Sequence, residues 1–99
     1  MLLARVAGTV VSTNKEPKIE GFKFLLLEKI DPLTMKGKND FVVAMDTVDA
    51  GVGEIVFFVS GSSARLTTPT EGRPTDAAVV AIVDAVDLED RTLYRKDRP

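Results

Sequence analysis

The feature that most constrains this chain is a set of short apolar runs. If these runs form strands, both faces of each strand are apolar, and neither face suits contact with water. Turns rich in glycine, proline and aspartate separate the runs, which are too short for three-turn helices and so predict β-strands. Three runs are apolar at consecutive positions, at residues 41–45, 55–59 and 77–83. A monomer would expose more contiguous apolar surface than soluble proteins usually tolerate, unless its own loops fold over these faces. We therefore predict burial against further copies of the chain.

The order of the runs predicts a small all-β domain. Strands are expected at 2–13, 22–30, 41–48, 54–60 and 78–88, a further short strand at 92–95, a turn at 36–40 and one short helical turn at 74–77. Gly8 inside the first run indicates a bulge or bend. Gly51 and Gly53 indicate positive φ angles in the turn between the third and fourth strands. Short strands at regular spacing are typical of a closed β-barrel, here five-stranded.

The 99 residues suffice for one domain, with a core expected at about 3–86 and a C-terminal extension at 87–99. Histidine and cysteine are both absent. This absence removes the commonest general base, the commonest zinc ligands and any disulfide, so we predict no enzyme, cofactor or metal site. No run approaches the roughly 18 apolar residues of a membrane span, which predicts a cytoplasmic location without a membrane partner.

Two features suggest other functions, and both are weak. Ser62 and Ser63 follow Gly61 in a loop, but the second glycine of a nucleophile elbow is missing, and no histidine exists to accept the serine proton. A serine–lysine dyad stays open, although close approach of the backbone explains the small residues better.

Small five-stranded barrels also bind single-stranded nucleic acid through exposed aromatic side chains beside a basic groove. The net charge of −2, the single tyrosine and the absence of tryptophan argue against nucleic-acid binding. We keep this function as the alternative.

Six segments occur in a defined order along the chain. They are A-R-V-x-G-x-V-V-S-T-x-K at 4–15, G-x-K-x-L-L-L at 21–27, V-A-x-D-x-V at 43–48, A-G-x-G-E at 50–54, G-S-S-A-R at 61–65 and D-A-A-V-V-A-I-V-D at 76–84. Together they resemble the EutN/CcmL family of bacterial microcompartment vertex proteins. The resemblance implies an OB-like barrel that forms a cyclic homopentamer, sits with hexameric shell proteins in a cytoplasmic microcompartment shell, and closes its vertices. It implies a structural role without catalysis or cofactor.

The resemblance also suggests where five copies would converge, and the apolar runs suggest where they would touch. Small side chains would suit a loop at the five-fold axis, which we place at Gly61, Ser62, Ser63, Ala64 and Arg65. Arg65 is expected to pair with a carboxylate, since five uncompensated guanidinium groups would repel one another. Its candidate partners are Asp46, Asp76 and Asp84. The predicted subunit interface contains Val43, Val80 and Ile82.

One departure from the family pattern concerns the turn after the third strand. The family turn commonly reads V-G-A-G, whereas Asp49 precedes Ala50 and Gly51 here, so a changed turn conformation is expected. The ending at 93–96 resembles the carboxysomal branch, while the segment at 61–65 also suits catabolic compartments. The encapsulated pathway is therefore left open.

Overall fold

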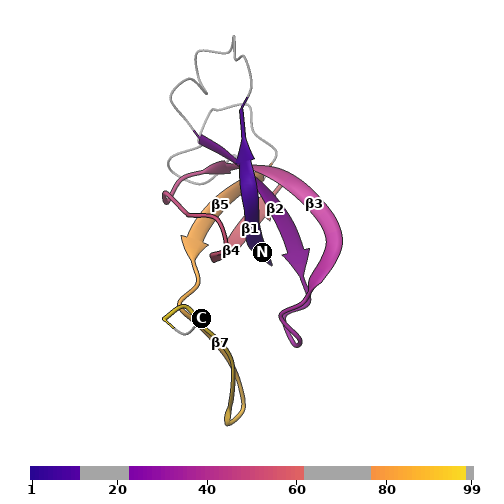
Figure 1. Ribbon diagram of the computed structural model, residues 1–99, viewed down its shortest axis with the longest axis vertical. Helices are drawn as coiled ribbons and strands as arrows, with labels where there is room; N and C mark the ends of the chain where they lie inside the picture. Colours follow the sequence, from indigo (N-terminus) through magenta and orange to yellow (C-terminus); the bar gives the residue numbers. More distant parts are fainter. Residues whose placement is uncertain (12–22, 62–76, 98–99) are drawn as a thin grey trace.

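Five strands close into a barrel in the order β1-β2-β3-β5-β4, with β1 paired to β4 (Figure 1). The computed structural model describes residues 1–11, 23–61 and 77–97. The barrel strands are β1 (Leu2–Val10), β2 (Lys23–Ile30), β3 (Gly37–Asp46), β4 (Ile55–Ser60) and β5 (Ala77–Ile82). All pairings are antiparallel except β3 with β5, which run parallel. The predicted five-stranded OB-like barrel is confirmed.

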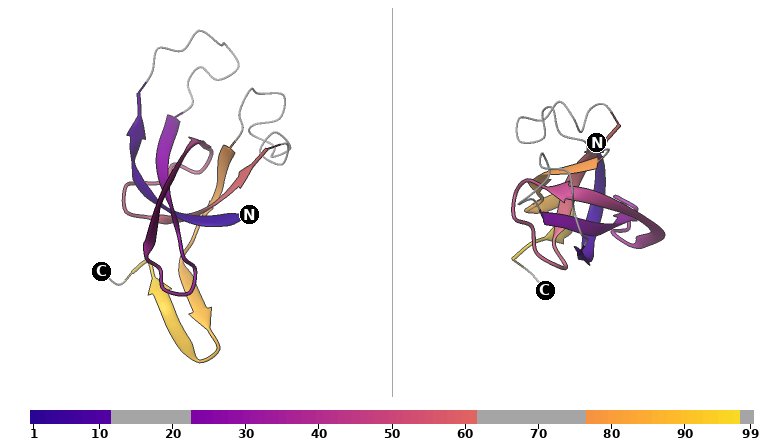
Figure 2. Two further views of the ribbon diagram at one scale, coloured as in Figure 1. Left: turned by 90° about the vertical axis from the view of Figure 1, so that its right-hand side faces the viewer. Right: turned by 90° about the horizontal axis from the view of Figure 1, so that it is seen from above.

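The strand predicted at 78–88 is wrong, because the chain changes partners in its middle. After β5, Val83 donates its N–H to the carbonyl of Ile55 (2.8 Å), and the chain then leaves the barrel. It continues as β6 (Ala85–Leu88), which pairs with β7 (Arg91–Arg95) in a separate two-stranded sheet. This hairpin projects beyond the end of the barrel in both side views (Figures 1 and 2). The exposed Asp84 marks the break, but one charged residue between two apolar segments did not predict a change of strand partner.

The extra strand predicted at 92–95 is confirmed as β7, but the two short turns differ from expectation. The turn predicted at 36–40 lies earlier in the chain. The N–H of Asp31 donates to the carbonyl of Lys36 (2.9 Å) and closes the turn, and Gly37 already belongs to β3, where it pairs with Ile30 of β2. No helix occurs in the described ranges. Ala77, the last residue of the expected helical turn, begins β5, and the other three residues lie outside the described part of the chain.

Backbone irregularities occur close to the positions that the glycines indicated. The pairing of β1 with β2 shifts register between Val6 and Gly8, which confirms the predicted bulge. In the turn before β4, Gly53 has a φ of 90°, whereas Gly51 has no positive φ. Asp49 takes this conformation instead, with a φ of 60°. Aspartate tolerates the left-handed region better than most residues, so Asp49 can adopt this conformation in the turn.

Alternation along the five strands fills the barrel with small and medium-sized side chains. The inner core consists of Ala4, Val6, Leu25, Leu27, Ala44, Ala50, Val56, Phe58, Ala77 and Val79. Phe58 is the largest of these side chains, and alanines from three strands and from the turn before β4 leave room for it. Because inward and outward residues alternate, the apolar residues between these positions must face away from this core.

Asp46 organises the turn between β3 and β4 and is the one buried charged residue among those described. Its carboxylate accepts hydrogen bonds from the N–H groups of Val48 and Ala50, both at 3.0 Å. It also lies 3.3 Å from the Lys23 ammonium on β2, which bonds Asp49 at 2.9 Å. Hydrogen bonds to Asp49 and Asp46 raise the pKa of Lys23 above 10.5. The turn is thereby attached to the neighbouring strand.

Replacing Asp46 by alanine should lower the free energy of unfolding by about 1–3 kcal/mol, because the buried N–H of Ala50 loses its acceptor. Urea unfolding at one fixed protein concentration measures the loss. Asp49→Asn is the matched control, since its carboxylate is exposed and asparagine keeps the positive φ. We expect little change for the control, and equal losses in the two variants would contradict the assigned role of Asp46.

Candidate functional site

The outward faces of β1, β2 and β3 carry a continuous apolar strip. The register places Val10 beside Phe24, and Leu26 beside Val43. Phe41 and Val43 are each 47% exposed, whereas the other three side chains are half-buried. We call Val10, Phe24, Leu26, Phe41 and Val43 the apolar strip. The strip uses the residues that alternation directs away from the inner core.

The structure places the three residues of the predicted interface in different environments. Val43 lies in the apolar strip. Val80 is half-buried, at the point where the register between β4 and β5 skips one residue. Ile82 is also half-buried, but it packs against the inner core. Val43 is therefore the most accessible of the three.

Only the first residue of the expected axis loop is described. Gly61 follows β4 directly and has a φ of 64°, a conformation that glycine adopts without steric cost. Ser62, Ser63, Ala64 and Arg65 lie outside the described residues, as does Asp76. Of the candidate partners of Arg65, Asp46 already pairs with Lys23.

The base of the β6–β7 hairpin is fixed to the barrel by a second apolar cluster. Ile30, Ile55 and Val83 form its buried centre, and Val86 of β6 and Tyr94 of β7 pack against it. This cluster was not predicted from the sequence, because its members come from four strands and the segment between β5 and β6. The signal available in advance was only that each residue is apolar.

An ion pair supports the same attachment. Lys96, just after β7, lies 2.9 Å from Glu54, just before β4. A backbone hydrogen bond from Gly51, together with Lys96, lowers the pKa of Glu54 below its usual 4.5. The bond to Glu54 raises the pKa of Lys96. The orientation of the hairpin relative to the barrel is therefore set by both apolar and charged contacts.

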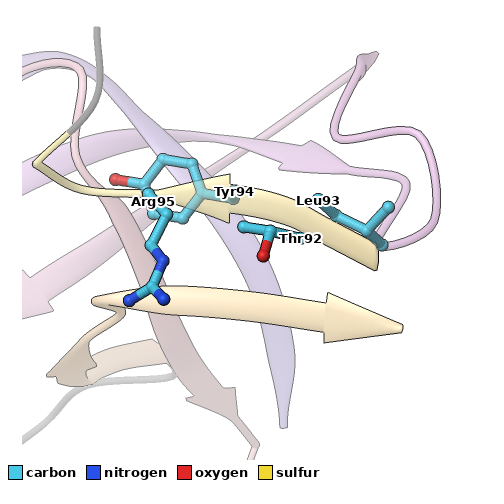
Figure 3. A pocket seen from close by; sticks show the side chains of 4 residues that line it. All are labelled: Thr92, Leu93, Tyr94 and Arg95. Atoms are coloured by element: carbon cyan, nitrogen blue, oxygen red, sulfur yellow. The ribbon is translucent and has the colours of Figure 1, made fainter. Parts of the chain in front are cut away.

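Three surface hollows occur among the described residues. The first, which we call the N-terminal hollow, has a volume of about 340 Å³ and is lined by Met1, Leu2, Leu3, Lys29, Ile30, Pro32, Lys38 and Phe57. The second, of about 250 Å³, lies on the hairpin and is lined by Thr92, Leu93, Tyr94 and Arg95 (Figure 3). The third, of about 380 Å³, is lined by Asp84, Arg95, Lys96 and Asp97. No described cluster of His, Cys, Asp or Glu could hold a metal ion.

The chain as a whole matches known proteins. A family model described as ethanolamine utilisation protein EutN/carboxysome matches residues 1–84. The chain belongs to the EutN/CcmL family. The resemblance seen in the six sequence segments is thereby confirmed.

Members of the EutN/CcmL family match nearly the whole chain. The carboxysome shell vertex protein CcmL of Synechococcus elongatus is 46% identical over 96 residues, which cover 97% of this chain and 96% of the relative. The structure of CcmL from Gloeobacter violaceus has a TM-score of 0.89 at 47% identity, over 97% of this chain and 98% of that chain. The GrpN pentameric microcompartment shell protein from Rhodospirillum rubrum has a TM-score of 0.79 at 42% identity, over 89% and 99%.

These EutN/CcmL relatives bear on the functional alternatives. Their names describe structural shell and vertex proteins, and no catalytic family is indicated. They support the predicted shell function and not single-stranded nucleic-acid binding. Within the described ranges, the chain has no helix with the length and apolarity needed to cross a membrane.

The lowered pKa of Glu54 predicts that the hairpin base loosens in acid. A depressed carboxyl pKa contributes stability that is complete above about pH 4.5 and is lost as the pH falls through the folded-state value. Tyr94 packs at this base and is the single tyrosine of a chain without tryptophan, so its fluorescence reports the attachment directly. Iodide quenching of Tyr94 should therefore increase between pH 7 and pH 3.

Glu54→Gln should remove most of this pH dependence and leave Tyr94 more accessible throughout. Glu89→Gln at the exposed hairpin turn is the matched control and should behave as the wild type. An unchanged acid response in Glu54→Gln would mean that another carboxylate controls the hairpin base.

Proposed function

We propose that this chain is a structural shell protein that forms cyclic homopentamers at the vertices of a bacterial microcompartment shell. The observation that carries the proposal is the apolar strip on the outside of a closed barrel, in a chain of the EutN/CcmL family. Relatives that match almost its full length are named carboxysome shell vertex proteins. A matching structure from the same family is described as pentameric.

The apolar strip gives a physical basis for ring assembly. Closure pairs β1 with β4 and β3 with β5, and the apolar side chains on the outer face remain available for contact with further copies. In a heterologous ring, each subunit presents one patch to the next subunit and a different patch to the previous one. Such a ring buries apolar surface on every subunit and stops growing when it closes.

Within this ring we propose a subunit interface that includes Val43, Val80 and Ile82. Exposure in the isolated chain favours Val43 as its central contact. We further propose that Gly61, Ser62, Ser63, Ala64 and Arg65 form the loop nearest to the five-fold axis, since small side chains suit a crowded axis. The positive φ of Gly61 lets the chain turn sharply at the start of this loop.

The ring would work with hexameric shell proteins in the cytoplasm. A flat sheet of hexagonal tiles needs five-fold positions before it can close into a polyhedron, and a ring of five subunits supplies them. We propose no catalytic step, cofactor, nucleic acid or membrane for this chain. A net charge of −2 offers little attraction to phosphate backbones.

Replacing Val43 by aspartate should dissociate the ring while leaving the barrel folded, because Val43 is exposed in the single chain. Five chains of 10.7 kDa give about 54 kDa for the wild-type ring in native mass spectrometry. The variant should appear mainly as monomers at neutral pH and regain rings in acid, since a buried carboxylate is neutralised by protonation.

Val52→Asp is the matched control for this substitution. Val52 is 67% exposed and lies in the turn before β4, outside the apolar strip. This control should keep the wild-type mass. Rings of unchanged mass and stability in Val43→Asp would exclude Val43 from the subunit interface.

The proposed function is tested by omitting the chain from reconstituted or cellular shells that contain no other vertex protein. Sheets and cargo gathering should persist, while electron microscopy shows elongated or incompletely closed bodies that admit a small dye. Adding back the wild-type chain should restore closure, and adding back Val43→Asp should not. An unchanged share of closed, dye-tight shells after omission would refute the vertex role.

A further inference from the structure

Among the residues that the structure describes, the contacts of the β6–β7 hairpin with the barrel lie at its base. Its two strands form a separate sheet, and an isolated two-stranded hairpin is marginally stable in water. The apolar cluster and the Lys96–Glu54 pair hold only the end nearest to the barrel. In Figures 1 and 2 the rest projects away from the barrel. The projecting part of the hairpin is therefore available for contact with a partner.

The exposed end of the hairpin is both apolar and acidic. Leu88 is 38% exposed at the end of β6. Asp87, Glu89 and Asp90 surround it, against the single cation of Arg91. We call residues 87–91 the tip. The hairpin also carries its own shallow hollow, over which the Arg95 side chain extends toward β6 (Figure 3).

The lining of the N-terminal hollow complements the tip, because it combines apolar side chains with positive charge. Its lining is mainly apolar, and Leu2 and Phe57 in it are 51% and 37% exposed. Two lysines complete the lining, and Lys38 has no carboxylate partner among the residues that the structure describes. Lys29 lies 3.4 Å from Asp40. The hollow therefore suits an apolar side chain that is accompanied by negative charge.

We infer that the hairpin is an arm whose tip docks into the N-terminal hollow of the neighbouring copy in the ring. Leu88 enters the apolar part, and the acidic groups of the tip face Lys38 and Lys29. The inference rests on the proposed ring. Each subunit then gives one arm and receives one, which is the relation that a heterologous ring requires.

Within one chain, the tip lies away from the amino end of β1, which supplies part of the lining of the N-terminal hollow. Figures 1 and 2 show the amino end of β1 and the hairpin turn well apart, and the hairpin base is fixed in orientation. The hairpin also lies beyond residues 1–84, which the family model matches. The arm therefore adds to a ring whose central contacts lie elsewhere, and its loss should weaken the ring without abolishing it.

The absence of cysteine allows a direct test by crosslinking. Leu88→Cys combined with Leu2→Cys should, on mild oxidation of the assembled ring, give covalent species of two to five chains on a non-reducing gel. Reduction should return them all to single chains. Val11→Cys with Leu88→Cys is the matched control, because Val11 is 94% exposed just beyond the opposite end of β1. This control pair should give no such ladder.

Native mass measured before oxidation separates the two proposals. If the wild-type chain forms no ring, the proposed function is wrong and the arm is excluded with it. If rings are present but the Leu2→Cys, Leu88→Cys variant gives no more crosslinks than the control variant, only the proposed docking of the arm is wrong. The same conclusion holds if the disulfide forms within one chain.

A charge exchange tests the same contact without cysteines. Lys38→Glu and Asp90→Lys should each raise the ring dissociation constant several-fold, and the double variant should recover part of the loss. The recovery should diminish at high salt, as expected for charges near the surface. Strictly additive losses at low salt would overturn the docking of the tip beside Lys38.

Discussion

The central constraint on this molecule is that a five-stranded barrel encloses too little volume for its apolar residues. Closure pairs every strand on both sides and fills the interior with ten side chains, mostly Ala, Val and Leu. The alternate positions of the same strands are also apolar, and they remain outside. The outer surface of the barrel therefore retains a tendency to associate.

Polar contacts determine how the irregular parts attach to this barrel. At one place, Asp46 holds the backbone of the following turn and connects it to β2 through Lys23. At another, Glu54 accepts a bond from Gly51 and pairs with Lys96 at the hairpin base. Both sites combine a carboxylate with a backbone N–H group, and they act together with the apolar contacts of Ala50 in the turn and Tyr94 in the hairpin.

The proposed role in shell closure follows from the apolar outer surface of the barrel and from the fixed attachment of the hairpin. The barrel provides a rigid block, the apolar strip provides attraction between copies, and the anchored hairpin provides a projecting element. A ring built from such blocks needs no catalytic group. This is consistent with relatives named as shell vertex proteins and with the absence of histidine and cysteine from the sequence.

The sequence by itself determined the strand content, the barrel and the family, because these depend on local apolar patterns and turn residues. The bulge at Gly8 also followed from this pattern, whereas the face that Val43 occupies did not. Only the tertiary structure decided where the strand predicted at 78–88 breaks, and that Asp46 pairs with Lys23. The N-terminal hollow and the hairpin base likewise join residues distant in sequence. Their formation depends on which strands become neighbours when the barrel closes, and a one-dimensional pattern of apolar residues does not contain that information.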